Sequence, residues 1–200
     1  MPNQELEHAL ARIDAMLKRH PRLGWDEVTR ELRALIRAKR NFSTKHSAVF
    51  SLADQLVKAA TPFVACEKGC ASCCYLPSLI FEHEAATLAK ASGLSMASLP
   101  YRPPRTVVSN MHRYFGVPCP FLEEQRCAVY AARPLACRVH MSFRDDSTVC
   151  DTRIPEDKRK PNVTYFADVI EVPYQVIVLA NNPKEPWGCI HEFFPPTQPL

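Results

Sequence analysis

The most constraining feature of this chain is a group of four cysteines within nine residues, in the segment Cys66-Glu-Lys-Gly-Cys70-Ala-Ser-Cys73-Cys74. Hydrophobic packing does not require thiols at this density. A metal ion or an iron–sulfur cluster does, because each needs several thiolates on a short stretch of backbone. The segment therefore predicts a metal-binding loop. Gly69 is expected to relieve a strained turn inside it.

The compartment in which the chain works decides how its nine cysteines are interpreted. The N-terminal segment Met-Pro-Asn-Gln-Glu-Leu-Glu lacks the apolar region of a signal peptide, and the sequence has no run of 18 apolar residues. We therefore expect a cytoplasmic protein that has no membrane partner. In a reducing compartment, cysteines indicate metal or redox chemistry rather than a disulfide framework.

A second group of cysteines follows at wider intervals, at Cys119, Cys127 and Cys137. With the first group they provide seven thiolates, which is too many for a single tetrahedral site. Seven suit either one four-ligand centre with accessory thiols or two centres that share ligands. Because adjacent side chains usually diverge, Cys73 and Cys74 are not expected to point at one atom. For the isolated Cys150 and Cys189, burial as small apolar residues is at least as good an explanation as a functional role.

The two groups together carry a family resemblance. The pattern resembles the YkgJ-like CxxCxxCC cysteine-cluster family, which is described as zinc- or iron-chelating and is often labelled Fe–S-cluster-containing. The resemblance implies metal binding much more strongly than any reaction. The resemblance extends from about Cys66 to His140. It includes the acidic start of a helix, Phe81-Glu82-His83-Glu84. The matching motifs are, in order, Cys66-x3-Cys70-x2-Cys73-Cys74, Cys119-Pro-Phe-Leu, Cys127-x-Val-Tyr-x-x-Arg133-Pro134 and Cys137-Arg138.

Three other polar residues near the cysteines are candidates for the same site. Arginine beside thiolates lowers their charge cost and donates hydrogen bonds to sulfur, so Arg133 and Arg138 are predicted to bind the cofactor. An ordinary exposed arginine is the alternative for each. His140 could ligate zinc as part of a Cys-x2-His pair, but Val139 and Met141 beside it favour a packed or solvent-facing side chain.

Four functional hypotheses follow. The leading one is an iron–sulfur cluster, [4Fe–4S], that serves redox chemistry or ligates a substrate, with an unidentified small molecule or redox partner. The second is structural zinc, since an all-thiolate tetrahedral set fits both metals. A radical-SAM enzyme is disfavoured, because Ser72 stands where those enzymes carry an aromatic residue. Nucleic-acid binding is suggested by a stripe of arginines on the second helix, Arg30, Arg33, Arg37 and Arg40. It is disfavoured because the net charge is only +4 and such a stripe is more often the solvated face of a helix.

Apolar periodicity predicts the rest of the fold. Three helices are expected before Cys66, with Ser43 or Thr44 capping the third and Pro62 ending it. A short strand is expected at 79–81, a helix over 82–92 that ends at Gly93, and a short helix over 107–114. Residues 163–179 fit helix or strand, and Pro173 is expected to break them. The fold class is mainly α with a loop-rich, metal-stapled core and few short strands, in three segments, 1–61, 62–142 and 143–200.

Overall fold

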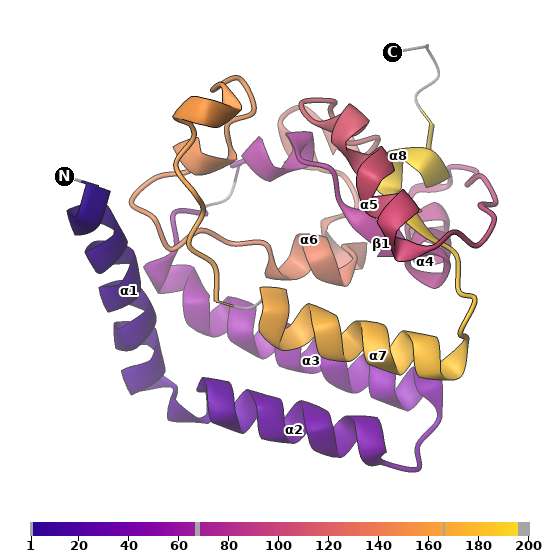
Figure 1. Ribbon diagram of the computed structural model, residues 1–200, viewed down its shortest axis with the longest axis horizontal. Helices are drawn as coiled ribbons and strands as arrows, with labels where there is room; N and C mark the ends of the chain where they lie inside the picture. Colours follow the sequence, from indigo (N-terminus) through magenta and orange to yellow (C-terminus); the bar gives the residue numbers. More distant parts are fainter. Residues whose placement is uncertain (1, 67–68, 166, 196–200) are drawn as a thin grey trace. The chain divides into compact units, whose positions relative to one another are not determined.

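A computed structural model describes residues 2–66, 69–165 and 167–195 (Figure 1). It confirms the mainly helical fold class with few strands. None of the helices in the described parts of the chain is both long enough and apolar enough to cross a membrane. The α-helices are α1 (Pro2–Arg19), α2 (Trp25–Arg37), α3 (Phe42–Ala60), α4 (Glu82–Ser92), α5 (Pro104–Met111), α6 (Leu135–Val139), α7 (Val172–Asn181) and α8 (Ile190–Phe193).

The strands are short and form two antiparallel pairs among the described residues. β1 (Leu79–Phe81) pairs with β4 (Trp187–Cys189), and β2 (Leu122–Glu123) pairs with β3 (Arg126–Cys127). Single turns of 3₁₀-helix connect many of the longer elements, at Pro21–Leu23, Thr61–Phe63, Ser72–Tyr75, His112–Tyr114, Tyr130–Ala132, Thr148–Cys150 and Glu156–Lys158.

The chain folds into two compact units, each built from three separate segments. The helical unit comprises the described residues of Met1–Glu67, Arg138–Val149 and Lys160–Pro183. The cysteine unit comprises those of Lys68–Cys137, Cys150–Arg159 and Lys184–Leu200. The division into 1–61, 62–142 and 143–200 is a division along the sequence and stays a prediction.

In the helical unit, α7 packs along α3, and α2 contacts both helices (Figure 1). Their facing side chains are almost fully buried, as the helical spacing of apolar residues predicts. In α1, Ala9 and Met16 are fully buried, while Leu6 and Leu10 are 39% and 52% exposed. The buried faces of the other helices include Val28, Leu32, Val49, Leu56 and Ile177.

Two local predictions in this unit were wrong. The cap of α3 is Asn41, whose side-chain oxygen accepts the Thr44 backbone N–H at 2.9 Å, rather than Ser43 or Thr44. Pro173 does not break the 163–179 segment. It occupies the first turn of α7, where the missing N–H costs nothing, and a π-helical turn, Ala167–Glu171, leads into it.

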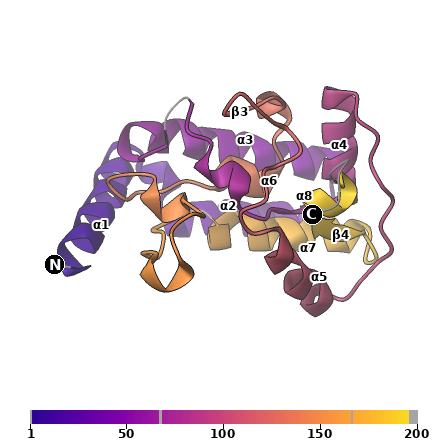
Figure 2. The ribbon, with the colours of Figure 1, turned by 90° about the horizontal axis from the view of Figure 1, so that it is seen from above.

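In the cysteine unit, the predicted strand at 79–81 and the helix at 82–92 are confirmed as β1 and α4. Gly93 ends α4 in the left-handed conformation at φ 74°. The helix predicted over 107–114 begins earlier, at Pro104, because a proline fits the first helical position. Figure 2 shows α5 near β4, with which it is in contact.

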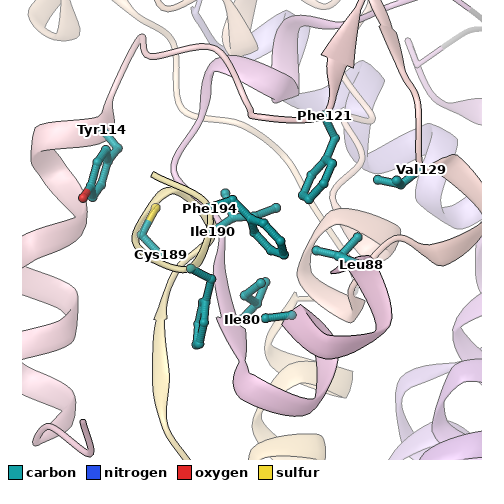
Figure 3. Packing of buried hydrophobic residues seen from close by; sticks show 10 residues of the cluster. Ile80, Leu88, Tyr114, Phe121, Val129, Cys189, Ile190 and Phe194 are labelled. Carbon is teal, nitrogen blue, oxygen red and sulfur yellow. The ribbon is translucent and has the colours of Figure 1, made fainter. Parts of the chain in front are cut away.

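The core of the cysteine unit is a cluster of aliphatic and aromatic side chains. Figure 3 shows it assembled from β1, α4, the 114–129 region and residues 189–194. Phe121 packs edge-on against Phe194, with ring centroids 4.8 Å apart. Cys119 and Cys127 are half-buried against the same cluster. Two of the predicted metal ligands are therefore held against this apolar core.

Candidate metal centre

The first cysteine group is shaped by a single 3₁₀ turn. Cys73 and Cys74 lie on this turn, Ser72–Tyr75, which is closed by the Cys74 N–H donating to the Ala71 carbonyl at 2.8 Å. Gly69 has φ 97°, a left-handed conformation that favours glycine, as predicted for this loop. The backbone thus presents two thiols from one tight turn.

Backbone hydrogen bonds tie the second cysteine group to the first. The Cys119 N–H donates to the Cys74 carbonyl at 2.7 Å, and the Gly116 N–H donates to the Tyr75 carbonyl at 2.9 Å. Both bonds cross more than 40 positions in the sequence. The segment before Cys119 therefore lies against the turn that carries Cys73 and Cys74.

Cys127 is positioned by the β2–β3 hairpin. Leu122 pairs with Cys127 across the ladder, and the two-residue turn is made by Glu124 and Gln125, at φ 46° and 59°. Positive φ at both central positions is the geometry of a type I′ turn, whose twist matches that of the strands. The Leu122 N–H also donates to the Cys119 carbonyl at 2.9 Å, which links the two cysteines through the hairpin.

Cys137 lies on the short helix α6, which is held by a buried carboxylate. Glu84 is only 5% exposed, and its two oxygens accept the backbone N–H groups of Phe81 at 3.1 Å and Leu135 at 2.8 Å. The bond to Leu135 places the start of α6 next to α4. The Cys137 thiol donates to the Ser78 hydroxyl at 3.4 Å.

The thiols influence one another electrostatically. The hydrogen bond from Cys74 and the charge of Arg133 lower the pKa of Cys73 to about 7. That same hydrogen bond, together with burial, raises the pKa of Cys74. Burial, followed by the neighbouring thiols, raises the pKa of Cys119 to about 11 and that of Cys137 to about 12. Burial also raises the pKa of Cys127.

These shifts identify five thiols that share one electrostatic neighbourhood, those of Cys73, Cys74, Cys119, Cys127 and Cys137. Full ionisation of such a group is unfavourable without a cation. A thiophilic metal would supply the missing positive charge, so the chemistry of the donor set fits a metal centre. In the described parts of the chain, however, no three cysteine, histidine or acidic side chains are already placed as metal ligands. Metal binding requires these side chains to converge.

Of the two predicted arginines, Arg133 lies within the electrostatic reach of the thiols. Its charge lowers the pKa of both Cys73 and Cys127. Its guanidinium lies 3.6 Å from the centre of the Tyr130 ring, and its Nε donates to the Tyr130 carbonyl at 3.2 Å. Arg138 has partners in the helical unit, Asp54 at 2.6 Å and the Phe50 ring at 5.3 Å. Binding of a cofactor by either arginine stays a prediction.

The two remaining predicted ligands are less defined by the structure. Cys70 donates weakly to the Ser72 hydroxyl at 3.9 Å. Cys66 belongs to the helical unit, and residues 67–68, which follow it, lie outside the described residues. Both stay predicted ligands from their positions in the sequence. His140, which the sequence offers as a possible zinc ligand, is half-buried in the helical unit. Burial lowers the pKa of its imidazole.

The surface beside Cys127 is hollowed. A hollow of about 690 Å³ lies over the β2–β3 hairpin, where it reaches Cys127. Tyr130, 62% exposed, stands three positions beyond Cys127 and carries Arg133 on its ring. The lining residues are Glu123, Glu124, Arg126, Cys127 and Ala128.

Sequence reasoning missed several residues that hold this site together. Glu84 was noted only as part of an acidic helix opening, and Ser78 carried no signal. Cys189, which the sequence explained equally well as a buried apolar residue, and His191 are not part of the thiol centre. They lie far from the cysteine groups in the sequence, and the pairing of β4 with β1 brings them into the cysteine unit. Such residues are identified only by contacts between distant segments, and the spacing of apolar residues along the sequence does not predict those contacts.

The resemblance to the CxxCxxCC family is confirmed over part of the chain. Residues 65–159 match the model of the family CxxCxxCC, described as "Putative zinc- or iron-chelating domain". This stretch contains all seven predicted cysteine ligands and both predicted arginines. No curated protein and no solved structure matches the chain. Metal chelation by clustered cysteines is therefore the function that the family match supports.

Proposed function

We propose that the chain holds an iron–sulfur cluster, of the [4Fe–4S] type, through thiolates of the cysteine unit. The observation that carries the proposal is the grouping of five thiols from three segments of the chain, in which the Cys119 N–H donates to the Cys74 carbonyl and the Leu122 N–H of the Cys127 hairpin donates to the Cys119 carbonyl. Four thiolates suffice for such a cluster, and sulfur ligands are what its iron atoms prefer. The ligands are drawn from Cys70, Cys73, Cys74, Cys119, Cys127 and Cys137.

The surroundings of the thiols suit a cluster in contact with a reactant. Arg133 brings a positive charge beside Cys73 and Cys127, which would offset the negative charge of cluster and thiolates. A surface hollow lined in part by Cys127 lies over the same hairpin. We therefore place at this hollow the approach of a redox partner or of a small molecule that the cluster ligates.

Metal analysis of anaerobically purified protein tests the proposal. We expect iron and acid-labile sulfide in equal amounts, about four of each per chain, and a broad visible absorbance that bleaches on reduction. Cys127→Ser and Cys137→Ser should each lower the iron and sulfide content. Arg126→Gln is the matched control, because it changes the same hairpin without removing sulfur. Iron-free, colourless protein from cells supplied with iron would overturn the proposal.

Structural zinc is the second candidate, favoured by the β2–β3 hairpin. A tight two-residue turn next to Cys127, with Cys119 bonded to its first strand, is short backbone that a four-thiolate zinc ion could hold in place. The same metal analysis separates the two: stoichiometric zinc without sulfide indicates the structural site. The family description includes both metals.

A further inference from the structure

A cysteine and a histidine outside the family-matched residues form a buried pair. Cys189 ends β4 and is fully buried, and His191 in α8 is 1% exposed. The Cys189 Sγ lies 3.4 Å from His191 Nδ1. Neither residue belongs to the thiol centre described above. Cys189 is a member of the apolar core cluster, where its thiol faces a histidine rather than carbon alone.

The hydrogen bonds of His191 fix which of its ring nitrogens carries the proton. Nε2 lies 3.1 Å from the Pro118 carbonyl oxygen, an acceptor, so Nε2 carries the hydrogen in the neutral ring. Nδ1 then directs its lone pair at Cys189, whose thiol donates to it. Tyr114 stacks on the ring at 4.9 Å with an interplanar angle of 8°, which holds its orientation.

This arrangement is the one usually seen at a histidine that ligates a metal. Such histidines donate their second ring N–H to a backbone carbonyl or a carboxylate, which orients the ring and fixes the tautomer. The spacing of the two donors fits as well. Zinc–sulfur and zinc–nitrogen distances of about 2.3 and 2.0–2.1 Å, at a tetrahedral angle, separate the two donor atoms by about 3.5 Å. The observed separation is 3.4 Å.

Cys119 supplies a third donor next to the pair. It follows Pro118, whose carbonyl binds His191, and its side chain packs against the buried cluster that contains Cys189. The third thiol has to turn towards the pair, since none of the described residues form a preassembled set of three donors.

We propose that Cys119, Cys189 and His191 form a second metal site, which takes a thiophilic divalent ion of the zinc type. This second site extends the proposed function, and it depends on that proposal only in using Cys119, which is also a candidate ligand of the thiol centre. Binding releases the two thiol protons to solvent, while His191 stays neutral with its hydrogen on Nε2. Without Cys119, five of the cysteines named for the cluster remain, and four suffice: Cys70, Cys73, Cys74, Cys127 and Cys137.

Zinc-edge X-ray absorption of the full, zinc-loaded chain tests the site, because imidazole gives a scattering pattern that thiolate does not. We expect mixed sulfur and imidazole ligation. His191→Phe, which preserves an aromatic ring for Tyr114, should abolish the imidazole pattern. Cys189→Ser, which keeps a hydroxyl donor for His191, should weaken the binding of one zinc ion per chain at least about tenfold in a chelator competition.

His140→Gln is the matched control, since His140 is also shielded enough for burial to lower its pKa. It should leave the imidazole pattern and the zinc affinity unchanged. Sulfur-only ligation in the unmodified chain overturns the second site, as does an imidazole pattern that is lost in His140→Gln instead. These results leave the thiol centre standing. If the chain binds neither zinc nor iron, both proposals fail. Should a variant unfold, the spectrum of the unmodified chain still decides.

Discussion

Glu84 connects two elements through a single carboxylate. Its oxygens accept one N–H from the start of α4 and one from the start of α6, and both helix N-termini favour a negative charge there. Cys137 lies two residues after the second of these donors. The position of one predicted metal ligand therefore depends on an acidic side chain that touches no sulfur.

Replacing Glu84 by Gln should destabilise the cysteine unit. The amide keeps one oxygen acceptor but turns an NH₂ group towards the second backbone donor, and an unsatisfied buried group costs about 1–3 kcal/mol. Urea unfolding of metal-free protein measures the difference. Glu82→Gln is the control, because it makes the same chemical change two residues earlier, at the half-buried start of α4. Equal stability of the two variants would contradict the role given to Glu84.

At the residue scale, the sequence identified candidate ligands but not their supports. The density of thiols between Cys66 and Cys74 predicts a metal site because hydrophobic packing does not require so many thiols on so short a segment. Glu84 and Leu135 are 51 positions apart, and nothing in either segment of the sequence predicts the hydrogen bond between them. Polar residues that act through distant backbone groups carry no local pattern.

Element boundaries depend on local chemistry, and the start of α3 illustrates it. Three of the four residues at 41–44 are good helix caps, namely Asn41, Ser43 and Thr44. The structure uses Asn41, whose side chain reaches the Thr44 N–H. Ser43 lies within the first turn instead.

Asn41→Ala should therefore lower the stability of the helical unit by about 1 kcal/mol, as the loss of a cap usually does. Ser43→Ala should change it by less than about 0.5 kcal/mol, the usual range for exposed sites. Thermal unfolding of both variants beside the unmodified chain measures the effect. A larger loss in Ser43→Ala would show that the cap lies where the sequence first placed it.

Among the elements, local signals predicted well and ambiguous ones poorly. Gly93 marks the end of α4 because its left-handed conformation suits glycine, and the structure ends the helix there. Residues 163–179 are rich in β-branched side chains, which fit strand or helix alike. The contact of α7 with α3 made that segment helical, and tertiary contact is not visible in the segment itself.

On the scale of the whole molecule, metal should stabilise one unit directly. The thiols of Cys73, Cys74, Cys119, Cys127 and Cys137 all belong to the cysteine unit, so the free energy of metal binding adds to the stability of that unit. Removal of metal by a chelator should increase amide hydrogen exchange in residues 117–137. Peptides from α3, in the helical unit, should keep their protection.

Hydrogen exchange followed by mass spectrometry, with and without chelator, reads both regions in one experiment. The protein treated with chelator and then given back its metal is the control for damage by the chelator. Equal loss of protection in both regions would show that the metal supports the whole molecule. Unchanged exchange at 117–137 would show that no structural role falls to the metal.

The fold class followed from the sequence at this scale, but the assembly of each unit did not. Few glycines, many prolines and three amphipathic stretches predict a mainly helical chain with irregular connections. The two compact units, by contrast, each combine segments separated by tens of residues. The pairing of β1 with β4 joins residues more than 100 positions apart, and no repeat or motif announces it.

That pairing has a consequence for the order of events during synthesis. A ribosome adds about 5–20 residues per second, so the strand Leu79–Phe81 waits roughly 5–20 s for Trp187–Cys189 to be made. During this interval Cys119 and Cys127 lack the part of their apolar support that residues 189–194 provide. In the nascent chain these thiols are therefore accessible to oxidants and to metal donors. Residues 189–194 pack against them only afterwards.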